Sequence, residues 1–193
     1  MTWDRSVPTH PIERPKVVYV EVPKAGCTSV KTMLSPLKGG PPQPWEDVHH
    51  WFGYTHARDH HQLGEWMRGR WSRYFRFTVV REPVARFESY FYGRMNPEED
   101  INEYALHQLA NDGDIHAARQ VDILGPFLSI FDFVGRLEYP QQITEVLQHQ
   151  LRRKVVMPHL NASEGERTRL NREALRAIRS HYRADFALLG YGR

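Results

Sequence analysis

The chain of 193 residues contains a single cysteine, Cys27, and lacks a long hydrophobic run. One cysteine excludes a disulfide scaffold and a cysteine-based zinc finger. The longest weakly polar run, residues 123–131, contains Gly125 and Pro126 and is far shorter than the roughly 20 apolar residues needed to cross a bilayer. The first residues carry charges without an apolar core, so no secretory signal is visible. We therefore expect a cytoplasmic protein.

An excess of charge of one sign is also missing. The chain has 26 Lys and Arg against 23 Asp and Glu, a net charge of +3, and 11 His. Such a mildly basic balance suits an anionic ligand but does not predict a nucleic-acid-binding tail. A hydrophobic content of 40% is typical of a globular protein. We expect one domain over residues 1–193, with a loosely ordered segment at residues 1–15.

Predicted strands alternate with predicted helices along the chain. Residues 17–22, 75–80 and 131–134 are rich in β-branched and aromatic side chains, which favours buried strands. Helical patterns follow over residues 28–34, 84–91 and 140–151, and a last one over 171–182 has Asn171 as its N-cap. A Gly/Pro-rich linker covers residues 35–44. This order predicts an α/β fold with a central parallel sheet, whose ligands bind at the carboxyl ends of the strands.

The first predicted strand leads directly into a turn rich in small and polar residues. Gly26 allows close approach of the backbone to a ligand, Thr28 and Ser29 add hydroxyl groups, and Lys24 adds a positive charge. At the start of a helix these groups form a cradle for phosphate or sulfate. The turn is not a Walker A loop, because the lysine precedes the glycine. An ordinary strand–turn–helix connection with a Ser/Thr cap is the alternative interpretation.

The second predicted strand ends at Arg81, where a ligand would lie. Arg86 and Ser89, three residues apart on the following helix, would share one face. An arginine fork and a hydroxyl suit a second anion, although an arginine could instead pair with Glu82 or Glu88 at the surface. Two anion sites at the ends of two parallel strands predict a ligand with phosphates at both ends.

These two motifs carry a resemblance to a known family. Residues 23–29, Pro-Lys-Ala-Gly-Cys-Thr-Ser, resemble the 5′-phosphosulfate loop of carbohydrate sulfotransferases of the family 2 type. Residues 81–89 resemble their 3′-phosphate motif, with Glu82 where Asp or Asn is usual. The likeness continues in order through residues 74–81, 131–138, 158–163 and 182–191, and so covers nearly the whole chain.

The resemblance implies a P-loop NTPase-like three-layer fold and transfer of a sulfuryl group. The donor would be 3′-phosphoadenosine 5′-phosphosulfate (PAPS), leaving adenosine 3′,5′-bisphosphate (PAP), and the acceptor a hydroxyl of a carbohydrate, glycoconjugate or small molecule. Arg81 and Ser89 would hold the 3′-phosphate, and Lys24 would also offset charge on the leaving group. The 5′-phosphosulfate would be held by Lys24, Ala25, Gly26, Cys27, Thr28 and Ser29. The resemblance implies no metal and no nucleic-acid partner.

Relatives of this kind place a catalytic histidine upstream of the second strand. The segment 49–61 contains five, and the sequence around His56 best matches the family pattern, so His56 is predicted as the general base, with His60 and His61 as alternatives. A zinc site is a rival interpretation, because His56 and His60 would lie one helical turn apart. Two other functions stay open: a non-catalytic anion- or glycan-binding domain, and a nucleotide-dependent kinase, which the glycine–lysine order disfavours.

Overall fold

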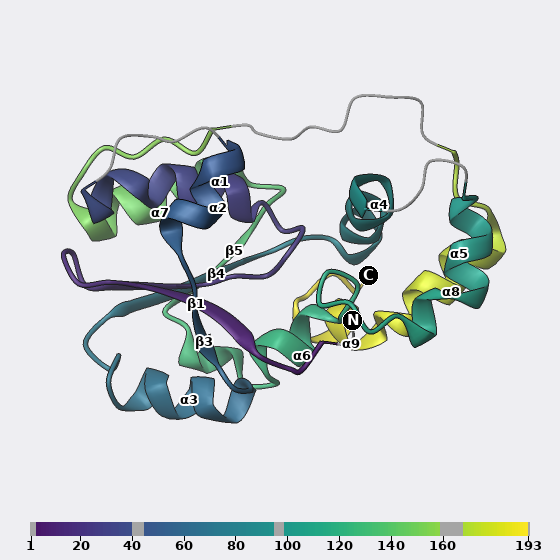
Figure 1. Cartoon of the computed structure of the whole chain (residues 1–193), viewed down its shortest axis with the longest axis horizontal. Helices are drawn as coiled ribbons and strands as arrows, with labels where there is room; N and C mark the ends of the chain where they lie inside the picture. Colours follow the sequence, from purple (N-terminus) through teal and green to yellow (C-terminus); the bar gives the residue numbers. More distant parts are fainter. Residues whose placement is uncertain (1–2, 40–44, 95–98, 159–167, 193) are drawn as a thin grey trace.

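A five-stranded sheet forms the centre of the computed structural model, which describes residues 3–39, 45–94, 99–158 and 168–192 (Figure 1). The strand order is β3–β1–β2–β4–β5. β2, β4 and β5 run parallel to one another, whereas β1 is antiparallel to both β2 and β3. The bounds are β1 (Val7–Ile12), β2 (Val17–Val20), β3 (Thr55–Ala57), β4 (Phe75–Val80) and β5 (Phe133–Arg136).

Helices cover both faces of this sheet. Figure 1 shows α1, α2 and α7 on one face, α3 and α6 on the other, and α4, α5 and α8 beyond the strand ends. The helices are α1 (Cys27–Leu34), α2 (Trp45–Phe52), α3 (His60–Arg68), α4 (Pro83–Arg94), α5 (Ile101–His107), α6 (Gln120–Leu124), α7 (Pro140–Leu151), α8 (Arg172–His181) and α9 (Arg183–Leu188), with short 3-10 turns at Ser35–Lys38, Leu109–Asn111 and Leu128–Ile130. The α/β class and the mainly parallel sheet are thus as predicted.

The β2 strand explains why the sheet is covered on both sides. Its side chains alternate, so Val18 and Val20 pack with α3 and α6 in one core cluster, while Val17 and Tyr19 pack with α1 and α7 in another. All four are buried, as the run of β-branched and aromatic residues predicts. A third cluster joins α4, α5 and α8. Asn171 caps α8 as predicted, because its side chain accepts a hydrogen bond from the Ala174 amide.

The amino-terminal segment differs from the expectation of a loosely ordered stretch over residues 1–15. Residues 7–12 form β1 inside the sheet, between β3 and β2, and most of this strand is buried. β1 was not foreseen because its sequence lacks apolar alternation and contains Pro8 and Pro11. A polar interaction helps to hold β1 in the sheet. Buried His10 donates a hydrogen bond to Glu21 at the end of β2, with 2.7 Å between Nε2 and Oε2.

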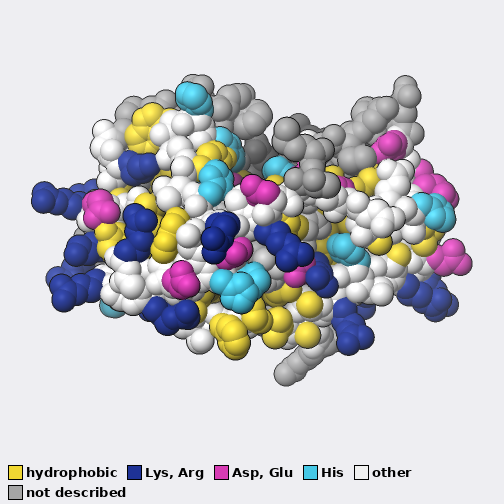
Figure 2. Space-filling view, turned by 60° about the horizontal axis from the view of Figure 1, so that its bottom comes forward, with side chains coloured by type: hydrophobic (Ala, Val, Ile, Leu, Met, Phe, Trp, Pro, Cys, Tyr) yellow, Lys and Arg dark blue, Asp and Glu magenta, His cyan; other side chains and the backbone are white. Residues whose placement is uncertain are grey.

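The face of the molecule shown in Figure 2 carries mixed charge. Figure 2 shows Lys and Arg side chains interspersed with acidic and histidine side chains on the face it presents, in keeping with the small net charge of +3. Among the residues that the structure describes, no helix combines the length and apolar character that a membrane crossing requires.

Parallel strands β2 and β4 are neighbours in the sheet, with Val20 opposite Thr78. Their carboxyl ends therefore open at the same edge. Lys24 follows β2 and Arg81 follows β4, so the fold brings the two predicted anion-binding motifs to one place.

Candidate active site

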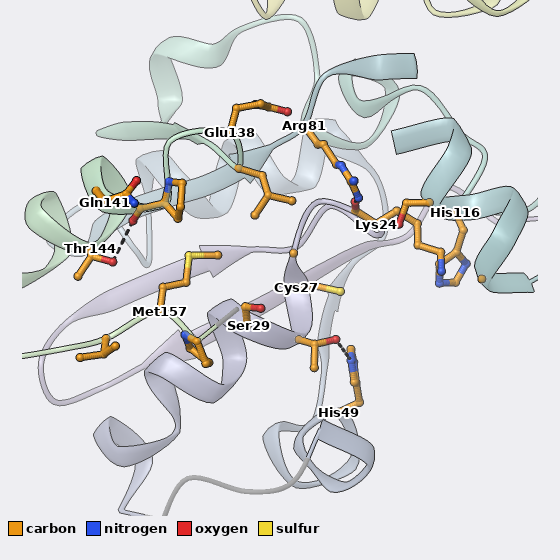
Figure 3. Close-up of a pocket in the computed structure, with 18 of the residues that line it drawn as sticks. Lys24, Cys27, Ser29, His49, Arg81, His116, Glu138, Gln141, Thr144 and Met157 are labelled. Atoms are coloured by element: carbon orange, nitrogen blue, oxygen red, sulfur yellow. Dashed lines mark hydrogen bonds between the residues drawn. The ribbon is translucent and has the colours of Figure 1, made fainter. Parts of the chain in front are cut away.

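One cavity of about 1090 Å³ is lined by residues from both motifs (Figure 3). The loop after β2 contributes Lys24, Gly26, Cys27, Thr28 and Ser29, and the β4–α4 motif contributes Arg81 and Ser89. The remaining lining comes from other segments: His49, Gly93, His116, Leu137, Glu138, Pro140, Gln141, Thr144, Glu145, Val156, Met157 and Pro158. Of the residues that the family resemblance assigns to the nucleotide, Ala25 alone is not in the lining; it is fully buried in the core beneath the loop.

The loop after β2 has the backbone of an anion cradle. Lys24 and Gly26 both adopt positive φ angles, of 65° and 79°, and α1 begins at Cys27. The first amides of a helix have no acceptor within it and point toward a ligand at its amino end. A Cβ on residue 26 would lie 2.6 Å from Leu137 Cδ1, so Gly26 serves both the turn and the close approach of β5 and its following loop.

Arg81 is fixed at the end of β4 by its backbone. The buried Gln120 side chain accepts a hydrogen bond from the Arg81 amide (3.0 Å) and donates one to the Arg81 carbonyl (2.7 Å). Arg81 Nη1 donates to the Lys24 carbonyl at 3.3 Å, which ties the second motif directly to the first. The guanidinium thus lies beside the cradle within one cavity.

Arg86 has a role other than the predicted one. It does not line the cavity but is buried, and its guanidinium donates to backbone carbonyls: Pro23 at 2.9 Å, Ala118 at 2.7 Å and Ile115 at 3.4 Å. The expectation of an Arg86–Ser89 anion fork is corrected accordingly, because these bonds commit Arg86 to the backbone. The arginine holds the segment 115–118 against the start of the loop after β2.

Glu82, the departure from the family pattern, has a clear structural function. Its carboxylate accepts a hydrogen bond from the Ala85 amide at 2.7 Å, in the first turn of α4. A carboxylate at a helix amino end satisfies an otherwise unpaired amide and interacts favourably with the helix dipole. The longer acid therefore still caps α4, and Arg81 and Ser89 both remain in the cavity lining.

The three histidines predicted as bases do not line this cavity. His56 is exposed on β3, where its ring stacks on Tyr54 with centroids 5.4 Å apart. His60 and His61 begin α3 and line a separate, smaller cavity with Phe127. The zinc interpretation requires His56 and His60 to lie on one helix. They do not, because His56 is in β3, which ends at Ala57, and His60 begins α3. Within the described part of the chain, no three His, Cys, Asp or Glu side chains come together as a metal site.

His49 on α2 lines the cavity and was not singled out from the sequence. Its Nε2 lies 3.0 Å from Thr28 Oγ1, and its Nδ1 lies 2.8 Å from the Nζ of buried Lys31. Burial lowers the pKa of His49, and the charge of Lys31 lowers it further, so the ring is neutral at neutral pH. Figure 3 shows His49 below the cradle, with its bond to the threonine drawn.

A buried ion pair holds Lys31 charged behind the cradle. Lys31 Nζ lies 2.7 Å from Glu21 Oε2 and donates to Tyr54 at 3.0 Å. Burial is the largest single influence and would lower the pKa of Lys31, but the negative charge of Glu21 and the hydrogen bonds to Glu21 and Tyr54 together raise the pKa. Burial would likewise raise the pKa of Glu21, yet hydrogen bonding from His10 and the charge of Lys31 lower it to about 2. Both groups are therefore ionised at neutral pH.

His116 is the second histidine that the sequence reasoning missed. It follows a short turn in which Asp114 accepts hydrogen bonds from the His116 amide (2.9 Å) and from His116 Nδ1 (2.6 Å). Figure 3 shows its ring on the Lys24 side of the cavity, away from Gln141, Thr144 and Met157. The one local signal for it is an aspartate two residues before a histidine, a spacing that favours such a turn.

Cys27 lies in the cradle but is not arranged as a nucleophile. Burial of its thiol raises the pKa to about 12, so the group stays protonated at neutral pH. Residues 159–163 of the family-like motif at 158–163 lie outside the described residues, and Pro158 lines the cavity.

The geometry defines an α/β protein in which two cationic motifs line one cavity. A sequence model of the sulfotransferase family matches residues 12–192, and the chain belongs to this family. No curated protein and no solved structure was found to match it. The family match covers both motifs as well as His49 and His116.

Proposed function

We propose that the protein is an enzyme that transfers a sulfuryl group from PAPS to an acceptor hydroxyl. One observation carries this proposal: Lys24 and Arg81, from neighbouring parallel strands, line the same cavity. A nucleotide charged at its 5′ and 3′ positions needs two cationic sites within one cleft. The fold class of P-loop nucleotide-binding proteins, with three layers around the sheet, belongs to the same proposal.

The residues of the cradle have separate tasks in this reaction. The amides from Gly26 to Ser29 and the hydroxyls of Thr28 and Ser29 bind the 5′-phosphosulfate. Lys24 stabilises negative charge that develops on the departing 5′-phosphate oxygen, an effect that is strongest where water is excluded. Arg81 and Ser89 bind the 3′-phosphate, for which a guanidinium is well shaped.

The cavity has room for more than the nucleotide. Its volume of about 1090 Å³ lies just above the ~300–1,000 Å³ of ordinary small-molecule sites. The Lys24, His49 and His116 side of the cavity is where we place the acceptor. Its class, a carbohydrate or glycoconjugate hydroxyl, is proposed from the family resemblance of the two motifs, and the cytoplasmic location stays a prediction from the sequence.

Binding and turnover together test the proposal. PAP and ATP are titrated against the protein by calorimetry, and transfer of labelled sulfate from PAPS is screened on sugars, lipids and small alcohols. We expect PAP to bind more tightly than ATP. Lys24→Ala should reduce turnover by about 100-fold or more, as loss of a preorganised positive group does. Lys16→Ala is the matched control, because Lys16 is exposed at the opposite end of β2.

Three results would contradict the proposed function. A preference for ATP favours the kinase interpretation. PAP binding without any sulfate transfer favours a non-catalytic binding domain. Equal losses of turnover in Lys24→Ala and Lys16→Ala would show that the cradle takes no part in the reaction.

A further inference from the structure

Two histidines, His49 and His116, line the cavity, and the groups that face their Nδ1 atoms are chemically opposite. An ammonium group, that of Lys31, faces Nδ1 of His49. A carboxylate, that of Asp114, faces Nδ1 of His116. In a neutral imidazole one nitrogen donates and the other accepts, so each neighbour selects the tautomer of its ring. This difference bears on which histidine can take a proton. The assignment of a general base rests on the proposed sulfotransferase function.

The tautomer of His49 follows from the hydrogen count of Lys31. An ammonium group has three hydrogens and accepts no hydrogen bond. The Lys31 ammonium is within 3.0 Å of three acceptors: Glu21 at 2.7 Å, His49 Nδ1 at 2.8 Å and Tyr54 at 3.0 Å. Nδ1 of His49 must therefore be the unprotonated nitrogen. The proton lies on Nε2, which donates to Thr28 Oγ1 at 3.0 Å.

That bond extends into the cradle. Because Thr28 Oγ1 accepts from His49, its own hydrogen is directed to another acceptor, and Thr28 lines the cavity. The chain Lys31, His49, Thr28 is thus a row of donors that ends at the place of the bound anion. Such a row strengthens binding of a sulfate or phosphate oxygen but gives His49 no basic nitrogen on the cavity side.

The tautomer of His116 is the reverse. An ionised carboxylate only accepts, so Nδ1 of His116 carries the hydrogen that it donates to Asp114 at 2.6 Å. Nε2 then keeps its lone pair. A carboxylate at Nδ1 also orients the ring and stabilises the imidazolium that forms when Nε2 takes a proton, as in hydrolase triads.

The backbone around His116 is fixed relative to the cradle. Arg86 bonds to the carbonyls of Ile115 and Ala118 on either side of it and to Pro23, the residue before Lys24. The Tyr182 hydroxyl donates to the Ala117 carbonyl at 2.7 Å. A general base must be held within hydrogen-bond reach of the acceptor hydroxyl, and this bracing supplies the required rigidity.

We infer that His116 is the general base, that Asp114 positions it, and that His49 is an N–H donor held in that state by Lys31. In the transfer step His116 Nε2 takes the proton of the acceptor hydroxyl, whose oxygen forms a bond to sulfur. The bond from sulfur to the bridging oxygen of the 5′-phosphate breaks, and its electron pair leaves with PAP. The proton ends on His116 and then passes to water.

The tautomers can be measured without any ligand. Nitrogen and carbon NMR shifts of the imidazole rings distinguish the two tautomers at a pH of about 8, where ordinary histidines are neutral. We expect the Nε2–H form for His49 and the Nδ1–H form for His116, with signals assigned by their loss in His49→Asn and His116→Asn. The double variant Glu21→Gln/Lys31→Met, which removes both charges of the buried pair, should release the preference of His49 alone.

Amide substitutions separate a donor from a base, because an amide donates a hydrogen bond but takes no proton. His49→Gln places an N–H near the position of Nε2, so it should keep turnover within about tenfold of the wild type. His116→Asn keeps a donor to Asp114 but should reduce turnover by about 100-fold or more, with PAP affinity retained. Asp114→Asn should likewise lower turnover more than PAP binding. His56→Asn, at the exposed histidine of β3, is the matched control.

The outcomes distinguish the base assignment from the proposed function. Wild-type protein that binds no PAP overturns the proposed function and the base assignment together. PAP binding with full turnover in His116→Asn overturns the base assignment alone, and a large loss in His56→Asn transfers the role to His56. An Nδ1–H form of His49, or an Nε2–H form of His116, contradicts the inferred tautomers directly.

Discussion

A single methyl group added at Gly93 should displace Lys24, the lysine of the proposed active site, without harming the fold. Gly93 lies in the last turn of α4, and a Cβ there would be 2.5 Å from Lys24 Nζ. An ordinary contact between these atoms is about 3.5 Å, so Nζ must move by roughly 1 Å in Gly93→Ala. A misplacement of about 1 Å at a reacting centre can cost up to about 100-fold in rate. We therefore expect turnover to fall by between about 10-fold and 100-fold.

The stability of Gly93→Ala should not fall with its turnover. Alanine is favoured over glycine within a helix by up to about 1 kcal/mol, so the free energy of unfolding should stay constant or rise. Gly64→Ala in α3 is the matched control: a Cβ there would make an ordinary contact, 3.4 Å from Arg68, outside the main cavity. Sulfate transfer and urea unfolding are measured for both. Unchanged turnover in Gly93→Ala, or an equal loss in Gly64→Ala, would refute the placement of Lys24.

Two further predictions concern the framework of the site. Because folding lowers the pKa of Glu21 from 4.5 to about 2, its ionisation stabilises the fold above pH 4.5, and this contribution is lost as the pH falls toward 2. Stability measured by circular dichroism should therefore fall less steeply with acid in Glu21→Gln/Lys31→Met than in the wild type. Arg86→Met leaves three backbone carbonyls without their donor, so urea unfolding should show a loss of about 3 kcal/mol or more, and an unchanged midpoint would contradict the role of Arg86 as a brace.

The sequence reasoning was strongest where local pattern decides the structure. β4 has the predicted bounds, and β2 was recognised because every residue in it is β-branched or aromatic. Such runs are typical of strands that are buried on both faces of a sheet. The two motifs could be placed near each other from the sequence, because parallel neighbouring strands end at the same edge.

The β1 strand could not be predicted in the same way. Its place in the sheet depends on pairing with two other strands and on the contact between His10 and Glu21, eleven residues apart. Polar residues inside a strand become acceptable only when a partner satisfies them, and a single sequence does not show the partner. The same applies to Arg86, whose acceptors are backbone carbonyls of distant segments.

The histidines predicted as bases, His56, His60 and His61, do not line the main cavity, and the reason is related. Residues 49–61 include five histidines, and their directions depend on where α2 ends and β3 begins. Only His49 of these enters the lining of the main cavity. His116 is brought there by Arg86 and Tyr182, which are distant from it in the sequence. Side-chain chemistry identified the residue type, whereas tertiary contacts selected the residue.

In the proposed function one nucleotide is bound at both of its charged ends, and a comparison of two ligands tests this binding mode. Calorimetric affinities of PAP and adenosine 5′-monophosphate are measured for the wild type and for Arg81→Ala. PAP should lose about tenfold or more in the variant, because a charge-assisted bond to the 3′-phosphate is gone, while the monophosphate should bind as before. Equal losses for both ligands, or none for PAP, would contradict this binding mode.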